Sequence, residues 1–195
     1  MAQPLTILRA GLGNPKLSGM SYEEIRNLAS SSAIEVERVC TLFHFLQQLV
    51  RIESIEPELI ATPILPLLAH AVEGVDMFFQ QCGVSLRTTL PDRAQPVLIN
   101  RLRTLEVLSS VLLIAQGISH FGNTVELIAT SDLSTAVRVV IRNLNAHVAD
   151  LSIDAGLGMA LVEANVRSQR ATVSWSLQPF TIQIVLPIAA TGGLS

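Results

Sequence analysis

The chain has 195 residues, of which 49% are hydrophobic and 15% are charged. This composition is typical of a globular protein with its own core and excludes a disordered chain. With 13 basic and 16 acidic side chains the net charge is −3, and without a basic stripe no nucleic-acid partner is expected. No apolar run reaches the roughly 18 residues of a membrane span. The first residues also lack the pattern of a signal peptide, so we expect a cytoplasmic protein.

Two helices are predicted at the N-terminus. Residues 2–12 favour a short helix with Pro4 in its first turn. Glycine, asparagine and proline residues then break the chain. Ser21, followed three residues later by Glu24, is typical of a capping box, which predicts the start of a second and longer helix.

The second helix carries a long, largely apolar seam. Its positions recur alternately every three and four residues, the spacing of a heptad repeat. They are Tyr22, Ile25, Ala29, Ser32, Val36, Val39, Phe43, Leu46 and Val50. Leu28, Leu42, Phe45 and Leu49 widen the stripe. Because a single hairpin cannot bury so wide a face, we expect two chains to form a four-helix bundle and hence a homodimer. The alternative is that the helix packs against the rest of its own chain.

After residue 57 the pattern changes to helices separated by pairs of strands. The first predicted elements are a strand or extended linker 59–62, a helix 64–82 ended by Gly83, and strands 84–89 and 96–99. A helix capped by Asn100 then reaches about residue 118, and strands 124–130 and 136–142 follow, joined by a hairpin loop 131–134. The last elements are a helix to about residue 167 and strands 171–176 and 179–186. This order predicts an α+β sandwich with a mixed sheet and its helices on one face. We therefore expect two domains, a helical hairpin 1–57 and a sandwich 58–195.

A short glycine pattern precedes the third of these helices. Residues 152–162 predict a loop that opens directly into an apolar helix, with Gly156 and Gly158 in the loop. Such a loop can hold a phosphate at the helix N-terminus. The alternative is an ordinary turn capped by Asp154 and kept for packing, which a lone glycine pattern does not exclude. Gly156 and Gly158 are therefore the only candidate cofactor-binding residues.

No catalytic or metal site is predicted from the remaining residues. His44 lies on the long helix and could accept a phosphoryl group, but the helix places no orienting acid beside it, so a surface histidine is expected. The other histidines lie in separate elements without metal-ligand spacing: His70, His120 and His147.

Several other residues have simple structural interpretations. Cys40 and Cys82 lie in apolar helical contexts and are expected to be reduced, buried thiols. Trp175 is expected in the core or on the sheet surface. Three charged residues at the start of a helix are expected to be solvated: Arg101, Arg103 and Glu106.

Taken together, the chain resembles the core of a bacterial sensor histidine kinase. Pro4-Leu5-Thr6, followed by a helical hairpin, resembles the dimerisation and histidine-phosphotransfer domain just after its phosphoacceptor histidine. The order of elements after residue 62 resembles the catalytic ATP-binding domain. The stretch 156–162 is similar to that domain's second glycine box, and the strand ending in Leu186-Pro187 resembles its last strand.

The residues that the family uses for catalysis are replaced or absent here. The phosphoacceptor histidine would precede Met1, five residues before Pro4. The resemblance places Ser110 and Ile114 at the family's two asparagines, of which one binds magnesium, and an aliphatic side chain cannot ligate that cation. Arg142-Asn143-Leu144-Asn145-Ala146 stands where the family has its adenine-binding aspartate and glycines, and the segment that would form the ATP lid is short.

The resemblance therefore implies a degenerate, pseudokinase-like protein without catalytic residues, ATP or magnesium. Its expected role is that of a dimeric interaction module in two-component signalling, with a response-regulator receiver domain as the partner of the helical hairpin. Two alternatives remain open. One is a histidine phosphotransferase on the same scaffold, with its histidine upstream of Met1, and the other is a fragment of an ATP-dependent sensor histidine kinase.

Overall fold

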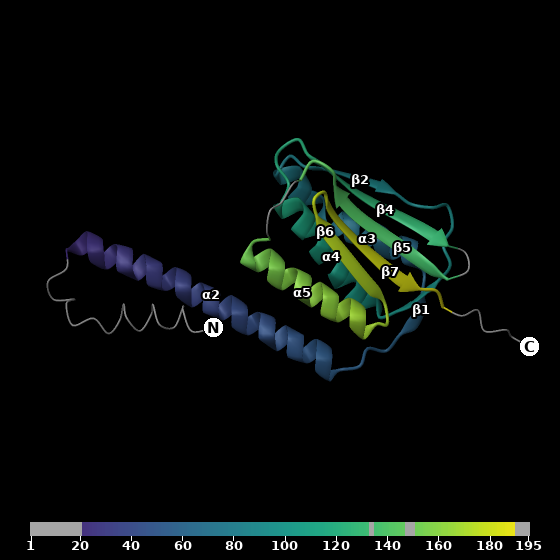
Figure 1. The fold of residues 1–195 in the computed structure, drawn as a ribbon, viewed down its shortest axis with the longest axis horizontal. Helices are drawn as coiled ribbons and strands as arrows, with labels where there is room; N and C mark the ends of the chain where they lie inside the picture. The colour runs from purple at the N-terminus through teal and green to yellow at the C-terminus, as the bar shows by residue number, and fades with distance from the viewer. Residues whose placement is uncertain (1–20, 133–134, 147–150, 190–195) are drawn as a thin grey trace, which may run out of the picture. The chain divides into compact units, whose positions relative to one another are not determined.

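The computed structural model describes residues 21–132, 135–146 and 151–189 (Figure 1). The predicted helix 2–12 and its Pro-Leu-Thr motif lie outside these residues. The chain divides into two compact units between Arg51 and Ile52, whereas the sequence analysis placed the boundary after residue 57. Each unit is described by itself.

The long helix α2 spans Tyr22–Ser54 and begins at the predicted capping box. The backbone N–H of Ser21 donates to Glu24 Oε2 at 2.7 Å, and the N–H of Glu24 donates to Ser21 Oγ at 3.3 Å. Two hydrogen bonds from Ser21 lower the pKa of Glu24 below its ordinary value. The bond from the Ser21 backbone N–H has the larger effect, and the bond from the Ser21 hydroxyl has the smaller one. Because the folded pKa is the lower one, this cap contributes fully above the unfolded pKa of about 4.3 and is lost as the pH falls through the folded value.

The predicted seam of α2 is largely exposed in the single chain. No residue of α2 is buried. Phe43 is 62% exposed and Val50 61% exposed, and four other large seam side chains are exposed as well: Tyr22, Ile25, Val36 and Leu46. An exposed apolar stripe of this length marks a surface that a partner can cover.

The second unit is an α+β sandwich. Its elements follow the predicted order: β1 (Ile60–Thr62), α3 (Ile64–Gln81), β2 (Ser85–Thr89), β3 (Val97–Ile99), α4 (Arg101–Gly117), β4 (Thr124–Asp132), β5 (Ala136–Asn143), α5 (Ile153–Ser168), β6 (Thr172–Leu177) and β7 (Phe180–Pro187). Asn100 caps α4 as predicted, since its Oδ1 accepts from the N–H of Arg103 at 3.1 Å.

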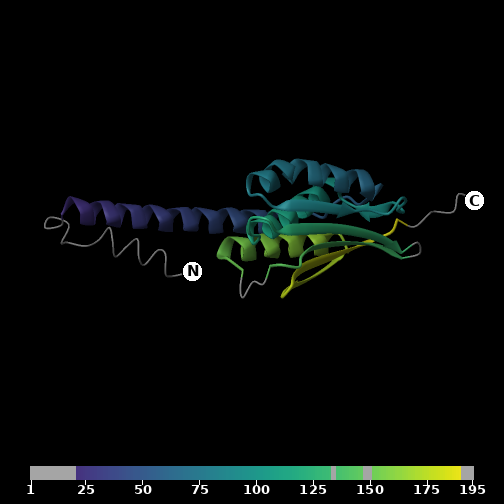
Figure 2. The ribbon, with the colours of Figure 1, turned by 90° about the horizontal axis from the view of Figure 1, so that it is seen from above.

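Five strands form one mixed sheet in the order β2-β4-β5-β7-β6, with β2 parallel to β4 and the other pairs antiparallel. Along β5 and β7 every second side chain is buried, so one face of the sheet forms the core and the other is open. The buried residues of α3, α4 and α5 join the same core. Helices α3 and α4 pack against one another and lie behind the sheet in Figure 1, and α3 lies along one side of the sheet in Figure 2. The prediction of a mixed sheet with helices on one face is thus confirmed.

One local prediction about strands was wrong. The hairpin loop was placed too early, because Ser131 and Asp132 still belong to β4 and pair with Val137 and Ala136. The sequence assigned no partners to the short strands β1 and β3, which pair with each other in a separate antiparallel ladder and do not join the main sheet. Short apolar runs do not specify such partners.

The cysteine and arginine predictions also need correction. Cys40 and Cys82 are free thiols, as predicted, but both are exposed. Arg103 is not a freely solvated residue. Its guanidinium donates to the carbonyl oxygens of Ile52 at 3.3 Å and Ile55 at 2.7 Å, and to Ser168 Oγ at 3.0 Å. It therefore holds the segment before β1 against the end of α5.

Gly83 ends α3 and gives a first testable prediction. Its φ is +63°, and a Cβ there would collide with the ring of Phe121. We expect Gly83→Ala to lower the free energy of unfolding by about 1–2 kcal/mol, because the left-handed conformation is unfavourable for alanine. Urea denaturation measures this loss. Gly117→Ala is the matched control, since Gly117 is helical with no atom within 4 Å of its added Cβ, and equal stability of both variants would contradict the prediction.

Candidate functional site

The residues that the sequence singled out for nucleotide chemistry come from three elements. Ile114 lies in the last turn of α4, Asn143 ends β5, and Gly156 and Gly158 lie at the start of α5. Helix α4 packs against both α5 and β5. The fold thus brings the candidate positions to one region of the second unit.

The two glycines lie inside a helix, which corrects the predicted loop. Helix α5 already begins at Ile153, and both glycines lie in its first two turns. The N-cap is Ser152, whose Oγ accepts from the N–H of Ala155 at 3.2 Å, and not Asp154. Neither glycine has a positive φ. The backbone here is a regular, capped helix start.

Ile114 lies directly against Gly158. A methyl group placed on Gly158 would lie 3.2 Å from Ile114 Cδ1 and 3.7 Å from Ile114 Cγ1. Ile114 is half-buried and packs against the hydrophobic core. An aliphatic side chain therefore lies next to the glycine helix at the position where the resemblance expects an oxygen ligand.

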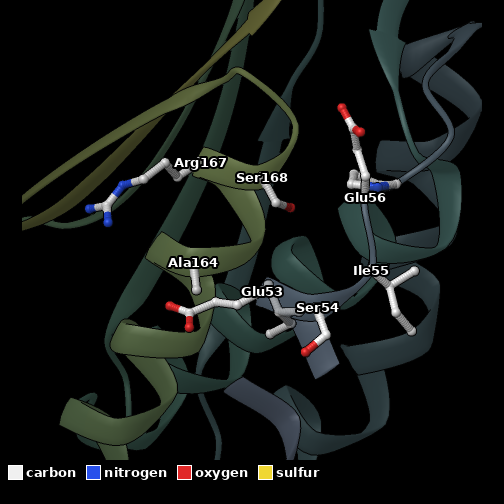
Figure 3. Close-up of a pocket in the computed structure, with 9 residues that line it drawn as sticks. Glu53, Ser54, Ile55, Glu56, Ala164, Arg167 and Ser168 are labelled. Atoms are coloured by element: carbon white, nitrogen blue, oxygen red, sulfur yellow. The ribbon is translucent and has the colours of Figure 1, made fainter. Parts of the chain in front are cut away.

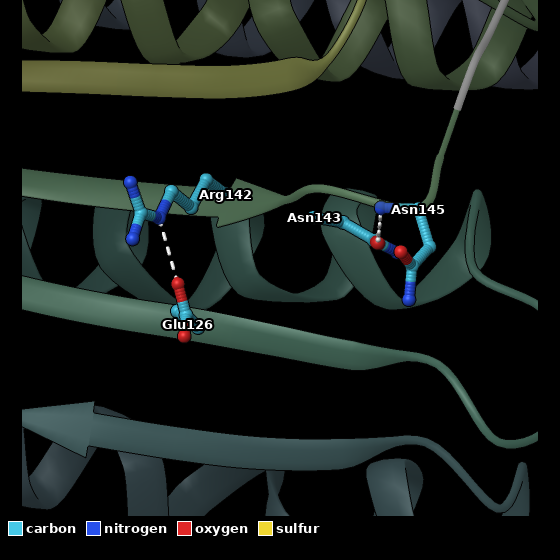
Figure 4. A network of polar contacts seen from close by, with 4 residues as sticks. All are labelled: Glu126, Arg142, Asn143 and Asn145. Atoms are coloured by element: carbon cyan, nitrogen blue, oxygen red, sulfur yellow. Dashed lines mark hydrogen bonds and ion pairs between the residues drawn. The ribbon is translucent and has the colours of Figure 1, made fainter.

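Asn143 is fully buried and has both of its polar atoms engaged. Figure 4 shows its contact with Asn145. Its Nδ2 donates to Ser119 Oγ at 2.7 Å and lies 3.5 Å from Asn123 Oδ1, and its Oδ1 accepts from the N–H of Asn145 at 3.0 Å. Ser119 in turn donates to the carbonyl oxygen of Ala115 at 2.6 Å. The asparagine thus ties the end of β5 to the end of α4.

Arg142, the neighbour of Asn143, points to the other face of the sheet. Its Nε donates to Glu126 Oε2 at 2.7 Å across the β4–β5 ladder (Figure 4). Both side chains are partly exposed, so this pair contributes little, about 0–1 kcal/mol. Arg142 is therefore outside the region that the candidate positions share.

The other sequence candidates do not assemble into a site. His44 is exposed on α2, and its Nε2 lies 2.6 Å from Gln48 Nε2. His70 and His120 are exposed, and His147 lies outside the described residues. Within the described ranges no group of three potential metal ligands occurs. No helix in that part of the chain is long and apolar enough to cross a membrane.

Within the described residues, one cavity lies near each end of α5. One, of about 430 Å³, lies between residues 52–57 and the end of α5 (Figure 3). Its lining residues are Ile52, Glu53, Ser54, Ile55, Glu56, Pro57, Ala164, Arg167 and Ser168. Sequence reasoning missed it because Arg103, which fixes this segment, bonds to residues about 50 positions away along the chain.

The second cavity, of about 340 Å³, lies between the start of α5 and strand β6. Its lining residues are Leu151, Ser152, Ile153, Gly156, Met159, Ala160, Glu163 and Trp175. Trp175 is 42% exposed, and its Nε1 donates to Glu163 Oε1 at 2.8 Å. The tryptophan is thus a surface residue of the sheet edge, one of the two predicted placements.

No protein-family model matches the chain, and no curated protein matches it either. The chain does match solved structures. The chain is similar to the histidine kinase AdeS of Acinetobacter baumannii, with 21% identity, a TM-score of 0.64, and coverage of 97% of this chain and 96% of that one. A histidine kinase from Burkholderia phymatum STM815 has 15% identity, a TM-score of 0.62 and coverage of 97% and 96%.

A third structure, the catalytic domain of histidine kinase ThkA, covers 67% of this chain and 97% of its own length, with 12% identity and a TM-score of 0.58. At these identities the likeness concerns the fold. Since both complete matches extend over nearly the whole chain, the long helix and the sandwich described above together have the fold of the histidine kinase core.

Proposed function

We propose that this chain is a catalytically silent protein with the histidine kinase fold, which dimerises through α2 and serves as an interaction module in two-component signalling. The contact of Ile114 with Gly158 carries the proposal. The resemblance assigns position 114 to an oxygen ligand of magnesium. An isoleucine offers the hard cation no ligand, and its Cδ1 lies 3.2 Å from the position of a Cβ added at Gly158.

The environment of Asn143 also supports the proposal. The family's aspartate accepts a hydrogen bond from the adenine amino group, whereas the Nδ2 of Asn143 is a donor and already bonds Ser119. Its Oδ1 accepts from the backbone of Asn145. The residues present do not fit a nucleotide with its magnesium ion, so no phosphoryl-transfer step is derived for this chain.

Nucleotide binding is tested by calorimetry with a non-hydrolysable ATP analogue and magnesium at high micromolar protein. We expect no saturable heat and no rise in melting temperature. A ligand at 100 times its Kd would add about 2.7 kcal/mol to the free energy of unfolding, which a thermal melt detects readily. An active histidine kinase domain is the positive control. Magnesium-dependent, saturable heat would contradict the proposal and favour the kinase fragment.

The proposed partner is a response-regulator receiver domain, bound at the helical hairpin that includes α2. In this arrangement the exposed polar side of α2 contacts the receiver domain, and its apolar seam contacts the second copy of the chain. An NMR titration with a purified receiver domain tests this assignment. Shifts confined to α2 would support it, and shifts confined to the sandwich would contradict it.

A further inference from the structure

Strand β6 is an open edge of the main sheet. It pairs with β7 on one side and with no other strand of the described residues. In an antiparallel ladder alternate residues of an edge strand direct their N–H and C=O groups away from the sheet. Such groups are complementary to one more extended chain.

The strand itself carries none of the sequence features that block such pairing. The sequence Thr172–Leu177 contains no charged residue and no proline, although both commonly protect natural edges. Thr172, Ser174 and Ser176 are exposed. The opposite edge of the sheet, β2, carries Arg87. Of the two edges of the five-stranded sheet, β6 is therefore the one without a charged side chain.

A cavity lies beside this edge, and its presence is independent of the open backbone groups of β6. It is the space of about 340 Å³ between α5 and Trp175. Trp175 pairs with the buried residue Ile182, so its side chain lies on the helix-covered side of the sheet. A chain added beside β6 would direct every second side chain to that same side. Figure 1 shows α5 running alongside β6 there.

We propose that the groove between α5 and β6 binds an extended segment of a partner polypeptide. The segment adds to the sheet as a sixth strand beside β6 and places an apolar side chain in the cavity at Gly156. This site goes beyond the proposed function and does not depend on it, because it uses neither the α2 seam nor any nucleotide-binding position other than the open side of Gly156.

The charges at the groove define the partner further. Among the described residues Glu163 is the one charged residue that lines the cavity, and its Oε1 accepts from Trp175 Nε1. Asp154, in the first turn of α5, is exposed. Both of these charges are negative, so an acidic residue is repelled at the cavity, whereas the exposed Arg170 precedes the first residue of β6 at the far end of the strand. The groove fits a segment with apolar residues at alternate positions and neutral or basic residues between them.

A synthetic peptide, Lys-Thr-Val-Thr-Leu-Thr-Val-Thr-Lys, is the probe. Titrated into the isotope-labelled full chain, it is expected to shift the amide signals of Thr172–Leu177 and Gly156 in a saturable way and to slow hydrogen exchange in β6. The same peptide with alternate backbone nitrogens methylated keeps its side chains but loses donors. We expect its affinity to fall about tenfold or more, since each lost hydrogen bond is worth about 1 kcal/mol.

Gly156→Leu tests the cavity without unfolding the protein. No atom lies within 4 Å of a Cβ added at Gly156, and leucine is a better helix former than glycine by about 0.8 kcal/mol. We expect an unchanged or higher melting temperature together with loss of peptide binding. Gly74→Leu is the matched control, because Gly74 is also helical, exposed and free of close neighbours, and it should bind the peptide normally.

Three outcomes would overturn the proposal. The first is that millimolar peptide leaves the β6 signals unchanged. The second is that Gly156→Leu binds the peptide as well as the unaltered chain does. The third is that protection of β6 rises with protein concentration alone, which would identify the occupant of the edge as a second copy of this chain.

Discussion

We expect Phe43→Glu to convert the proposed α2 dimer to a monomer in multi-angle light scattering. Phe43 lies in the middle of the α2 seam and is 62% exposed in the single chain. In a bundle of two chains its ring would be buried. Loss of that burial, and burial of a charge in its place, cost about 3 kcal/mol per chain. For a symmetric dimer the sum of about 6 kcal/mol raises the Kd by a factor of about 10⁴.

Thr41→Glu is the matched control for this variant. Thr41 is exposed on the same helix, and two residues of α-helix separate it from Phe43 by about 200°, which places it on the opposite side. We expect this variant to remain dimeric, and circular dichroism should show equal helix content in both. The dimer proposal is wrong if Phe43→Glu stays dimeric, or if the unaltered chain is monomeric at all concentrations.

Asn143→Asp, which introduces the carboxylate typical of the kinases, lowers the free energy of unfolding by about 2 kcal/mol at pH 7. A carboxylate cannot donate to Ser119 Oγ, and Ser119 already uses its own proton to bond the carbonyl oxygen of Ala115. The new charge is also buried, because position 143 is 0% exposed. Urea denaturation measures the loss, and the variant is expected to bind no nucleotide, since Ile114 is unchanged.

The pH dependence of this variant follows from the same burial. Burial raises the pKa of a carboxyl group above its unfolded value of about 3.9. The folded state then binds the proton more tightly, so stability falls as the pH rises through the folded pKa, and the deficit shrinks toward pH 4. Asn145→Asp makes the same change at an exposed position and should be nearly neutral. A deficit that is independent of pH would contradict this explanation.

Local signals in the sequence predicted most of the elements. The capping box of Ser21 and Glu24, the cap at Asn100 and the helix end at Gly83 each depend on residues at most four positions away along the chain. Such signals can be recognised in the sequence alone. The alternation along β5 and β7 is equally local, and with the order of the elements it gave the mixed sheet. Capping residues and apolar periodicity were enough to predict these features, because each feature depends on neighbours along the chain.

Features that depend on distant neighbours were not predictable in this way. Arg103 was expected in solvent, but its partners are Ile52, Ile55 and Ser168. The separate β1–β3 ladder also rests on long-range pairing. The glycine pattern at 156–158 was interpreted as a loop because glycine favours turns, while the cap that starts the helix, Ser152, precedes it. The sequence pattern does not specify how Gly156 and Gly158 pack, because their neighbour Ile114 lies far from them along the chain.

The contact between Ile114 and Gly158 constrains how this chain can change further. A methyl group on Gly158 would lie 3.2 Å from Ile114 Cδ1, so the two positions are coupled, and substitutions at them should not have additive effects. Replacing Ile114 by asparagine removes apolar packing from the core edge before any ligand can compensate. A single change to an oxygen-bearing side chain at position 114 is therefore expected to cost stability by itself. It should be tolerated best together with a second change at or around Gly158.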